Sequence, residues 1–136
     1  MNTTSMTPYE KLGGETAIRT LVHRFYELMD ELPEAYSVRK LHPQSLAGAE
    51  LALFEFLSGW FGGPGLYVAK KGHPRLRMRH APYAIGAGVR DEWMLCMTQA
   101  LTEQVMDVNF RNSLIYKFSE MASHLLNTDG NESCSF

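Results

Sequence analysis

The chain has few cysteines and no excess of charge of either sign. Its 136 residues include 13 Lys and Arg and 15 Asp and Glu, for a formal net charge of −2. Such a balance gives no electrostatic support for binding to nucleic acid or to an anionic membrane. The two cysteines differ in setting, because Cys96 lies in an apolar helical pattern and Cys134 in the polar tail. They predict free thiols in a reducing compartment, and we expect a cytoplasmic protein.

Long apolar runs are also missing. No stretch approaches the roughly 18 apolar residues of a membrane span, and the start MNTTSMTPYEKLGG lacks the basic and apolar regions of a secretory signal. No alternating apolar and polar stretch indicates a strand, and there is no internal repeat. We therefore expect one all-α domain over residues 1–136, with its core at about 8–126 and a mobile tail over 127–136.

Apolar residues at helical spacing dominate the chain. Four segments carry them three and four positions apart, which predicts four amphipathic helices over residues 15–29, 46–60, 93–105 and 110–125. The stretch PEAYSVRKLHP leaves room for one or two helical turns. After the second long helix come several helix breakers, which predict an extended loop over 62–72: Gly59, Gly62, Gly63, Pro64 and Gly65.

The segment PRLRMRHA, after this loop, holds the histidine with the most unusual setting. Pro74 suits the first turn of a short helix and Pro82 should end it, so His80 lies near the C-terminal end. On pattern alone such a histidine is more often structural than a ligand, since an imidazolium is favoured at a helix C-terminus. Zinc is disfavoured, because the chain has neither HExxH nor CxxC. One histidine facing an apolar cleft is, however, how haem iron is held.

The other four histidines allow ordinary interpretations. His23 and His124 lie beside the apolar stripes of their helices, which predicts solvent-facing side chains. His73 precedes Pro74, where it could cap the short helix, and His42 precedes Pro43 in a loop, where it could face solvent or a pocket.

Several motifs together resemble the truncated haemoglobins of group II. They are LAGAE (46–50), WFGGPGLY (60–67), GHPRLRMRHAPY (72–83) and DEWMLCM (91–97), with Phe25-Tyr26 in the first long helix. The resemblance covers about residues 8–126, and GGP combined with GHPRLRMRHAP is highly specific. It implies a truncated globin fold, which is a two-over-two helical sandwich around a haem. In this family the element before the proximal histidine is mostly loop.

The resemblance also implies roles for polar residues. His80 would be the proximal iron ligand through Nε2, while its Nδ1–H donates to a backbone carbonyl, expected to be that of Leu76. The family's distal polar positions match Tyr26, His42 and Trp93, although without the family the two larger aromatics would be read as core. Many relatives have tyrosine or phenylalanine in place of His42. Its tautomer therefore stays open, as does whether it bonds ligand, Tyr26 or iron.

The cofactor implied by the resemblance is haem b, iron protoporphyrin IX. Arg79 and Tyr67 are candidates for binding its propionates, with Lys70 and Arg77 as further candidates. Ala49 matches the position where many globins have a distal histidine, and its methyl group cannot donate a hydrogen bond. Apolar pocket residues, which would equally be ordinary core, are Phe25, Ala49, Leu53, Phe56, Leu57, Leu76, Ile85 and Met97.

Two functions could use such a pocket. One is reversible binding, and hence transport, of dioxygen or another diatomic ligand at ferrous iron, stabilised by Tyr26, His42 and Trp93. The alternative is a redox enzyme, peroxidase-like or oxidising nitric oxide with dioxygen, with His42 as the candidate catalytic base and an unidentified reductase as partner. A haem-free helical interaction module would leave His80 and Trp93 without a joint role. We expect a monomer or small homo-oligomer, and neither nucleic acid nor membrane as a partner.

Overall fold

The computed structural model describes residues 6–81 and 83–127, and every regular element in these ranges is a helix. The four longest helices, α2 (Gly14–Glu31), α4 (Ala47–Trp60), α7 (Ala87–Gln104) and α8 (Val108–His124), match the four predicted segments, with α7 starting six residues earlier. The shorter elements are α1 (Pro8–Leu12), a 3-10 turn over Pro33–Ala35, α3 (Tyr36–Lys40), α5 (Leu66–Lys71) and α6 (Leu76–His80). Within the described ranges, no helix is both long and apolar enough to span a bilayer.

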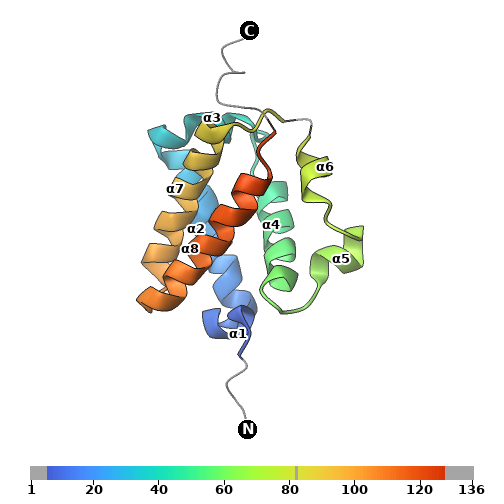
Figure 1. The fold of residues 1–136 in the computed structure, drawn as a ribbon, viewed down its shortest axis with the longest axis vertical. Helices are drawn as coiled ribbons and strands as arrows, with labels where there is room; N and C mark the ends of the chain where they lie inside the picture. The colour runs from blue at the N-terminus through green and yellow to red at the C-terminus, as the bar shows by residue number, and fades with distance from the viewer. Residues whose placement is uncertain (1–5, 82, 128–136) are drawn as a thin grey trace.

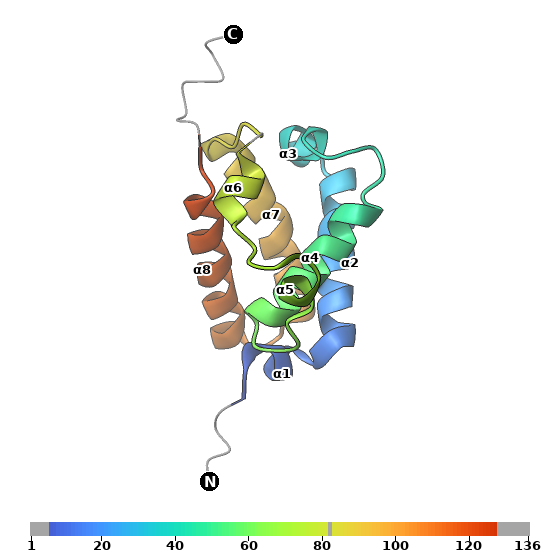
Figure 2. The ribbon, with the colours of Figure 1, turned by 90° about the vertical axis from the view of Figure 1, so that its right-hand side faces the viewer.

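The long helices form two antiparallel pairs that pack against each other, α2 with α4 and α7 with α8 (Figures 1 and 2). This arrangement confirms the expected two-over-two sandwich. The core lies where α2 crosses α7, and Phe118 of α8 packs there against the rings of Trp60, Phe61 and Trp93. Full burial of one such phenylalanine contributes roughly 1.5–3 kcal/mol. Cys96 is a free, buried thiol whose pKa burial raises to about 11.

The prediction of an extended loop over 62–72 is wrong in its second half, where α5 forms. The segment LYVAKK contains no helix breaker, and the glycine-rich part ends at Gly65. A tertiary contact requires glycine in this loop, because a Cβ atom on Gly63 would collide with the ring of Tyr9. Phe61 O also accepts a hydrogen bond from Tyr9 N at 2.9 Å. The glycines therefore let the end of α4 pack directly on α1.

Helix α1 was not predicted, although a local signal for it exists. Thr7 Oγ1 accepts from the backbone N–H of Glu10, and Glu10 Oε1 accepts from the backbone N–H of Thr7, both at 3.1 Å. This reciprocal capping box is encoded by the letters TPYE, with a proline in the first turn. The helix spans only five residues, too few for an apolar stripe to reveal it.

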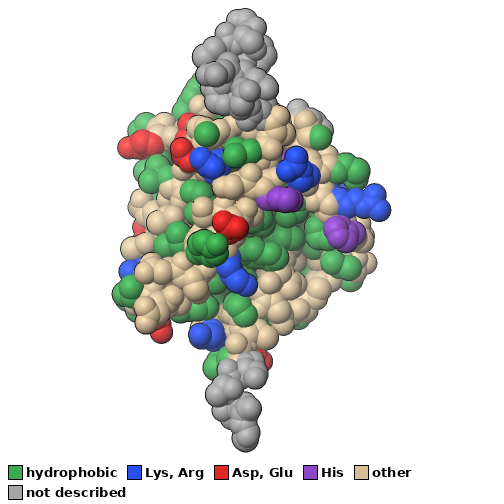
Figure 3. All heavy atoms as spheres, in the orientation of Figure 1, with side chains coloured by type: hydrophobic (Ala, Val, Ile, Leu, Met, Phe, Trp, Pro, Cys, Tyr) green, Lys and Arg blue, Asp and Glu red, His purple; other side chains and the backbone are tan. Residues whose placement is uncertain are grey.

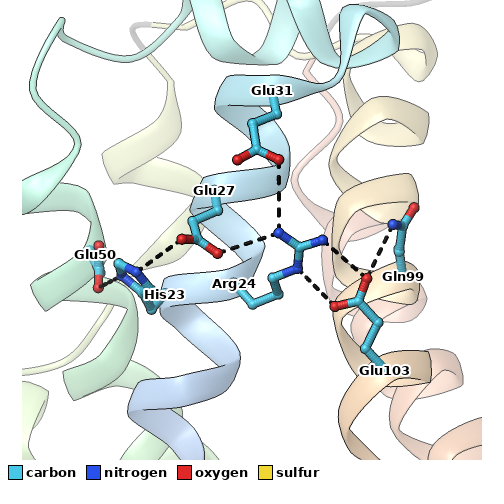
Figure 4. Close-up of polar contacts among 7 residues, drawn as sticks. All are labelled: His23, Arg24, Glu27, Glu31, Glu50, Gln99 and Glu103. Carbon is cyan, nitrogen blue, oxygen red and sulfur yellow. Dashed lines mark hydrogen bonds and ion pairs between the residues drawn. The ribbon is translucent and has the colours of Figure 1, made fainter.

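A chain of ion pairs on the surface joins α2 to its neighbours (Figure 4). Its first member, His23, is exposed as predicted, but both ring nitrogens face carboxylates: Nδ1 lies 3.0 Å from Glu50 Oε2 and Nε2 lies 3.3 Å from Glu27 Oε2. Carboxylate oxygens only accept hydrogen bonds, so both contacts require the doubly protonated imidazolium. On the other side, Arg24 donates to Glu103 of α7 at 2.8 Å. The pairs thus connect α2 to α4 and to α7.

We predict that His23 titrates above its ordinary pKa of 6.5 in the folded protein. The hydrogen bond and the charge of Glu50 are the main causes, and Glu27 adds to them. Because the folded-state pKa is raised, the stabilisation is complete below about pH 6.5 and is lost as pH rises through the folded-state pKa. The side chains are exposed, so it should not exceed about 1 kcal/mol. NMR titration of the imidazole should give a lower pKa in Glu50→Gln.

The matched control for this prediction is Glu15→Gln, which breaks another exposed pair on α2, that with Arg19. It should leave the His23 titration unchanged. If wild-type His23 titrates at or below 6.5, the ion pair between His23 and Glu50 that joins α2 to α4 is absent in solution.

Candidate functional site

His80 is the last residue of α6 and is half-buried. Its Nδ1 lies 2.7 Å from the carbonyl oxygen of Leu76, which confirms the hydrogen bond predicted from the sequence. A carbonyl oxygen can only accept, so Nδ1 carries the proton. In the neutral imidazole, Nε2 is then left with its lone pair. The ring is therefore held in one orientation, and the lone pair of Nε2 can bind a metal.

The start of α6 differs from the prediction. The helix begins at Leu76, two residues after Pro74, because Arg75 adopts a left-handed conformation with φ 47°. His73 Nδ1 accepts a hydrogen bond from Arg75 N at 3.1 Å, but Arg75 is the N-cap residue and no side chain caps α6, so the capping role predicted for His73 is wrong. A left-handed arginine is an uncommon conformation that no local sequence signal predicted. It turns the chain sharply just before the helix that carries His80.

The segment after His80 is fastened by Asn127, which sequence reasoning assigned to the mobile tail. Its Nδ2 donates to the carbonyls of His80 and Tyr83, at 3.2 and 2.8 Å. Its Oδ1 accepts from Ile85 N at 2.8 Å, and its own N–H donates to Ile85 O at 3.0 Å. Asn127 is therefore a positioning residue for α6. The rest of the predicted tail, with Cys134, lies outside the described residues, as does Pro82.

The three predicted distal residues come together from three parts of the fold. Tyr26 lies on α2, His42 follows α3, and Trp93 lies on α7. The rings of Tyr26 and His42 are 5.8 Å apart between centroids. The ring of Phe25 contacts those of Tyr26 and Trp93, with centroid distances of 4.8 Å and 4.9 Å. The buried ring of Phe25 therefore contacts both the phenol of Tyr26 and the indole of Trp93.

The tautomer of His42, which the sequence left open, follows from its surroundings. Nδ1 lies 2.9 Å from the carbonyl oxygen of Val38, so it carries the proton and Nε2 keeps a lone pair. Burial lowers the pKa of His42, the positive charges of Arg39 and His80 lower it further, and the bond to Val38 opposes them. His42 is therefore a neutral base near pH 7.

Tyr26 and Trp93 supply the hydrogen-bond donors. Burial, with a smaller effect from the charge of Glu50, raises the pKa of Tyr26 well above its ordinary value, so the phenol stays protonated. Among the described residues, no hydrogen-bond partner is found for Tyr26 Oη or Trp93 Nε1, yet no buried side-chain oxygen or nitrogen there lacks a partner. Both atoms therefore reach accessible space, where each could donate to a small ligand.

The predicted apolar pocket residues divide into two groups. Phe25, Leu57, Ile85 and Met97 are buried, whereas Ala49, Leu53 and Phe56 are half-buried and pack against the core. Leu76 lines a groove of about 370 Å³ between α4, α6 and α8. The groove also contains three half-buried apolar residues that sequence reasoning did not assign to the site: Trp60, Met121 and Leu125.

Figure 3 shows this side of the molecule, with hydrophobic side chains in a hollow beside α8 and with basic and histidine side chains around it. Arg79 lies 5.6 Å from the centroid of the buried Tyr67 ring and donates through Nε to Pro74 O at 2.8 Å. Lys70 and Arg77 already have partners, the first in a 2.7 Å pair with Glu55 and the second at 2.8 Å from His124 O. Arg77 and Arg79 each bond only a backbone carbonyl among the described residues, so both remain candidates for binding an anionic group here, whereas Lys70 is paired with a carboxylate.

A larger groove, of about 900 Å³, lies between α2, α4 and α7. Its lining includes Arg19, His23 and Glu103, and it contains none of the predicted site residues. Its charged groups are mostly paired with one another (Figure 4). Size alone therefore does not identify the chemical site. The oriented imidazole and the unpartnered donors lie elsewhere.

Comparisons with known proteins agree with this geometry. A family model described as bacterial-like globin matches residues 7–127. The cold-adapted truncated haemoglobin of Pseudoalteromonas haloplanktis is 44% identical, with a TM-score of 0.89 over 90% of this chain and 99% of that one. The group II two-on-two haemoglobin of Agrobacterium tumefaciens is 42% identical, with a TM-score of 0.89 over 93% and 98%. The truncated oxygen-avid haemoglobin of Bacillus subtilis is 32% identical, with a TM-score of 0.80 over 90% and 100%.

Proposed function

We propose that this chain, which belongs to the bacterial-like globin family as a group II truncated haemoglobin, binds dioxygen or another small diatomic molecule reversibly at a haem. The family implies a haem cofactor. The observation that carries the proposal is the oriented imidazole of His80, whose Nδ1 donates to Leu76 O and whose Nε2 is free. The oxygen-avid character of the Bacillus subtilis relative supports dioxygen as a ligand.

The residues present fit a haem. Leu76, one turn before His80, lines the smaller groove together with half-buried apolar side chains of α4 and α8, which a flat apolar group would cover. His80 would supply the axial nitrogen, and the apolar pocket residues would pack against the ring, with Arg79 and Tyr67 near its carboxylates. When bound, the haem iron supplies the position at which a diatomic ligand coordinates. The chain has no C-x-x-C-H motif for covalent attachment, which favours haem b.

The distal residues would act as donors and as a base. Tyr26 stays protonated and Trp93 has a single N–H, so both suit a ligand that gains negative charge. A hydrogen bond to a charged group contributes roughly 1.5–3 kcal/mol. His42 differs, because its proton is on Nδ1 and bonded to Val38 O. In its neutral form His42 accepts a proton and does not donate one to a ligand.

This tautomer favours a second candidate function, a peroxidase-like reaction. General-base catalysis needs a group within reach of the substrate proton whose pKa leaves it unprotonated at the working pH. The lowered pKa of His42 and its free Nε2 meet these conditions. Reversible ligand binding needs no such base.

We predict that His80→Ala abolishes stable haem binding, because it removes the imidazole that the hydrogen bond to Leu76 O orients on α6, the helix whose Leu76 lines the groove. Haem content and absorption spectrum of the purified variant measure this. The matched control is His23→Ala, whose exposed side chain lies on α2 and outside the smaller groove, and which should keep its full haem content. A wild-type spectrum and full haem content in His80→Ala would rule out the proximal assignment.

Trp93→Phe should increase the dioxygen dissociation rate about tenfold or more, since it removes the indole donor and keeps an aromatic ring against Phe25. The other tryptophan provides the control, because Trp60→Phe removes an indole that stacks on Phe56 and is not among the predicted donors. Stopped-flow measurement should show less than a twofold change for Trp60→Phe. Equal rates for Trp93→Phe and wild type would reduce Trp93 to a packing role.

His42→Phe should lower the rate of peroxide reaction with the ferric protein by roughly 10²-fold, the usual scale for a positioned base. Because the pKa of His42 is lowered, the wild-type rate should fall to half of its plateau value only below pH 6.5. His42→Gln keeps a hydrogen-bonding group without basicity, so it should react as slowly as His42→Phe. A peroxide rate that either substitution leaves within twofold of wild type argues against the peroxidase candidate and leaves ligand binding unaffected.

A further inference from the structure

Charge is distributed very unevenly along this chain. Residues 56–90 carry six Lys and Arg and no Asp or Glu, for a formal charge of +6, whereas the remaining residues carry −8. The segment includes α5 and α6, which follow one another along one edge of the molecule (Figure 1). A protein with a net charge of only −2 therefore presents a concentrated positive region.

Most of this positive charge is not neutralised locally. Lys70, the first cation of the segment, pairs with Glu55 at 2.7 Å, and Arg90, the last, pairs with Asp91 at 3.0 Å. The cations between them are exposed and have no carboxylate partner among the residues that the structure describes: Lys71, Arg75, Arg77 and Arg79. By contrast, Arg19, Arg24 and Arg39 on the first helices all form ion pairs.

Exposed apolar side chains lie among these cations. Val68 and Met78 have 56% and 58% of their surface accessible, and Leu66 and Tyr83 are also exposed. Figure 3 shows basic side chains next to hydrophobic ones over α5 and α6. Arginine, methionine and aromatic residues are enriched in protein–protein interfaces. We call the group formed by Val68, Lys71, Arg75, Arg77 and Met78 the α5–α6 surface.

We propose that the α5–α6 surface docks a small acidic electron-transfer protein that reduces the haem iron. This inference rests on the proposed function, because the surface adjoins His80, the residue that would hold the iron. One electron would leave the reduced redox group of the partner and convert iron(III) to iron(II), with no bond formed or broken. Attraction between opposite charges would speed the encounter, and the apolar side chains would fix a transient complex.

The distribution of charge favours this partner over a polyanion. A nucleic acid or an anionic membrane extends past a surface of this size and would meet the net charge of −8 on the rest of the chain. A small globular partner contacts only the α5–α6 surface. Docking on α6 also places a partner against the helix that ends at His80.

The test uses the haem-loaded protein with two probes of strong net negative charge, a reduced flavodoxin and a reduced plant-type [2Fe–2S] ferredoxin. Charge reversal in Lys71→Glu/Arg75→Glu should weaken binding of the effective carrier and slow reduction at least tenfold at about 10 mM ionic strength, where screening is weak. Lys11→Glu/Lys40→Glu is the matched control, since both lysines are exposed at the ends of short helices. It should change the rate less than threefold.

Four further measurements make the outcome decisive. Chemical-shift changes on adding the oxidised carrier should concentrate in residues 66–80, and Lys71→Gln/Arg75→Gln should have an intermediate effect. At about 1 M salt the variants should become equal. Reduction by dithionite should be the same in all of them.

The proposal is overturned if neither carrier binds, if both charge-reversal pairs slow reduction equally, or if only DNA or anionic vesicles bind to this surface. Failure of the chain to take up haem would refute the proposed function instead.

Discussion

The hydrogen bond from His80 Nδ1 to the carbonyl of Leu76 is the interaction on which the proposed site depends. It decides which nitrogen is free and where the ring points. Helix α6 has only five residues, none of them buried, so packing alone cannot hold it. Its position comes instead from Asn127, which bonds the segment after His80, and from Arg77, which bonds the end of α8. The C-terminal end of α8 therefore supports the residue that would bind iron.

Three histidines of this chain show how hydrogen-bond partners set imidazole chemistry. His80 and His42 each donate from Nδ1 to the carbonyl four residues earlier, which leaves Nε2 with a lone pair. His23 has a carboxylate at each nitrogen, so it is favoured as a cation. The first two can act as ligand or base, and the third serves as an electrostatic link between helices. Local partners, rather than residue type, separate these roles.

The sequence predicted the four long helices well, because the spacing of residues such as Ile18, Leu21 and Phe25 records which face is buried. The sequence also predicted the residues of the candidate site, through motifs specific to the family. The prediction from sequence failed where tertiary contacts decide the local structure. The left-handed conformation of Arg75 moves the start of α6 to Leu76, and Asn127 is ordered by hydrogen bonds to residues over 40 positions away. The tautomer of His42 likewise depends on the position of the Val38 carbonyl, which composition and spacing do not reveal.

The central claim is that one imidazole, that of His80, holds a haem whose other axial position is available to a diatomic ligand. The most direct test is the absorption spectrum of the purified protein in its ferric, ferrous and carbon monoxide-treated ferrous forms. We expect a Soret band with one haem per chain and a ferrous spectrum of a five-coordinate iron that shifts on adding carbon monoxide. A protein that shows no Soret band after incubation with equimolar haem, or a ferrous spectrum that carbon monoxide does not change, would contradict the account.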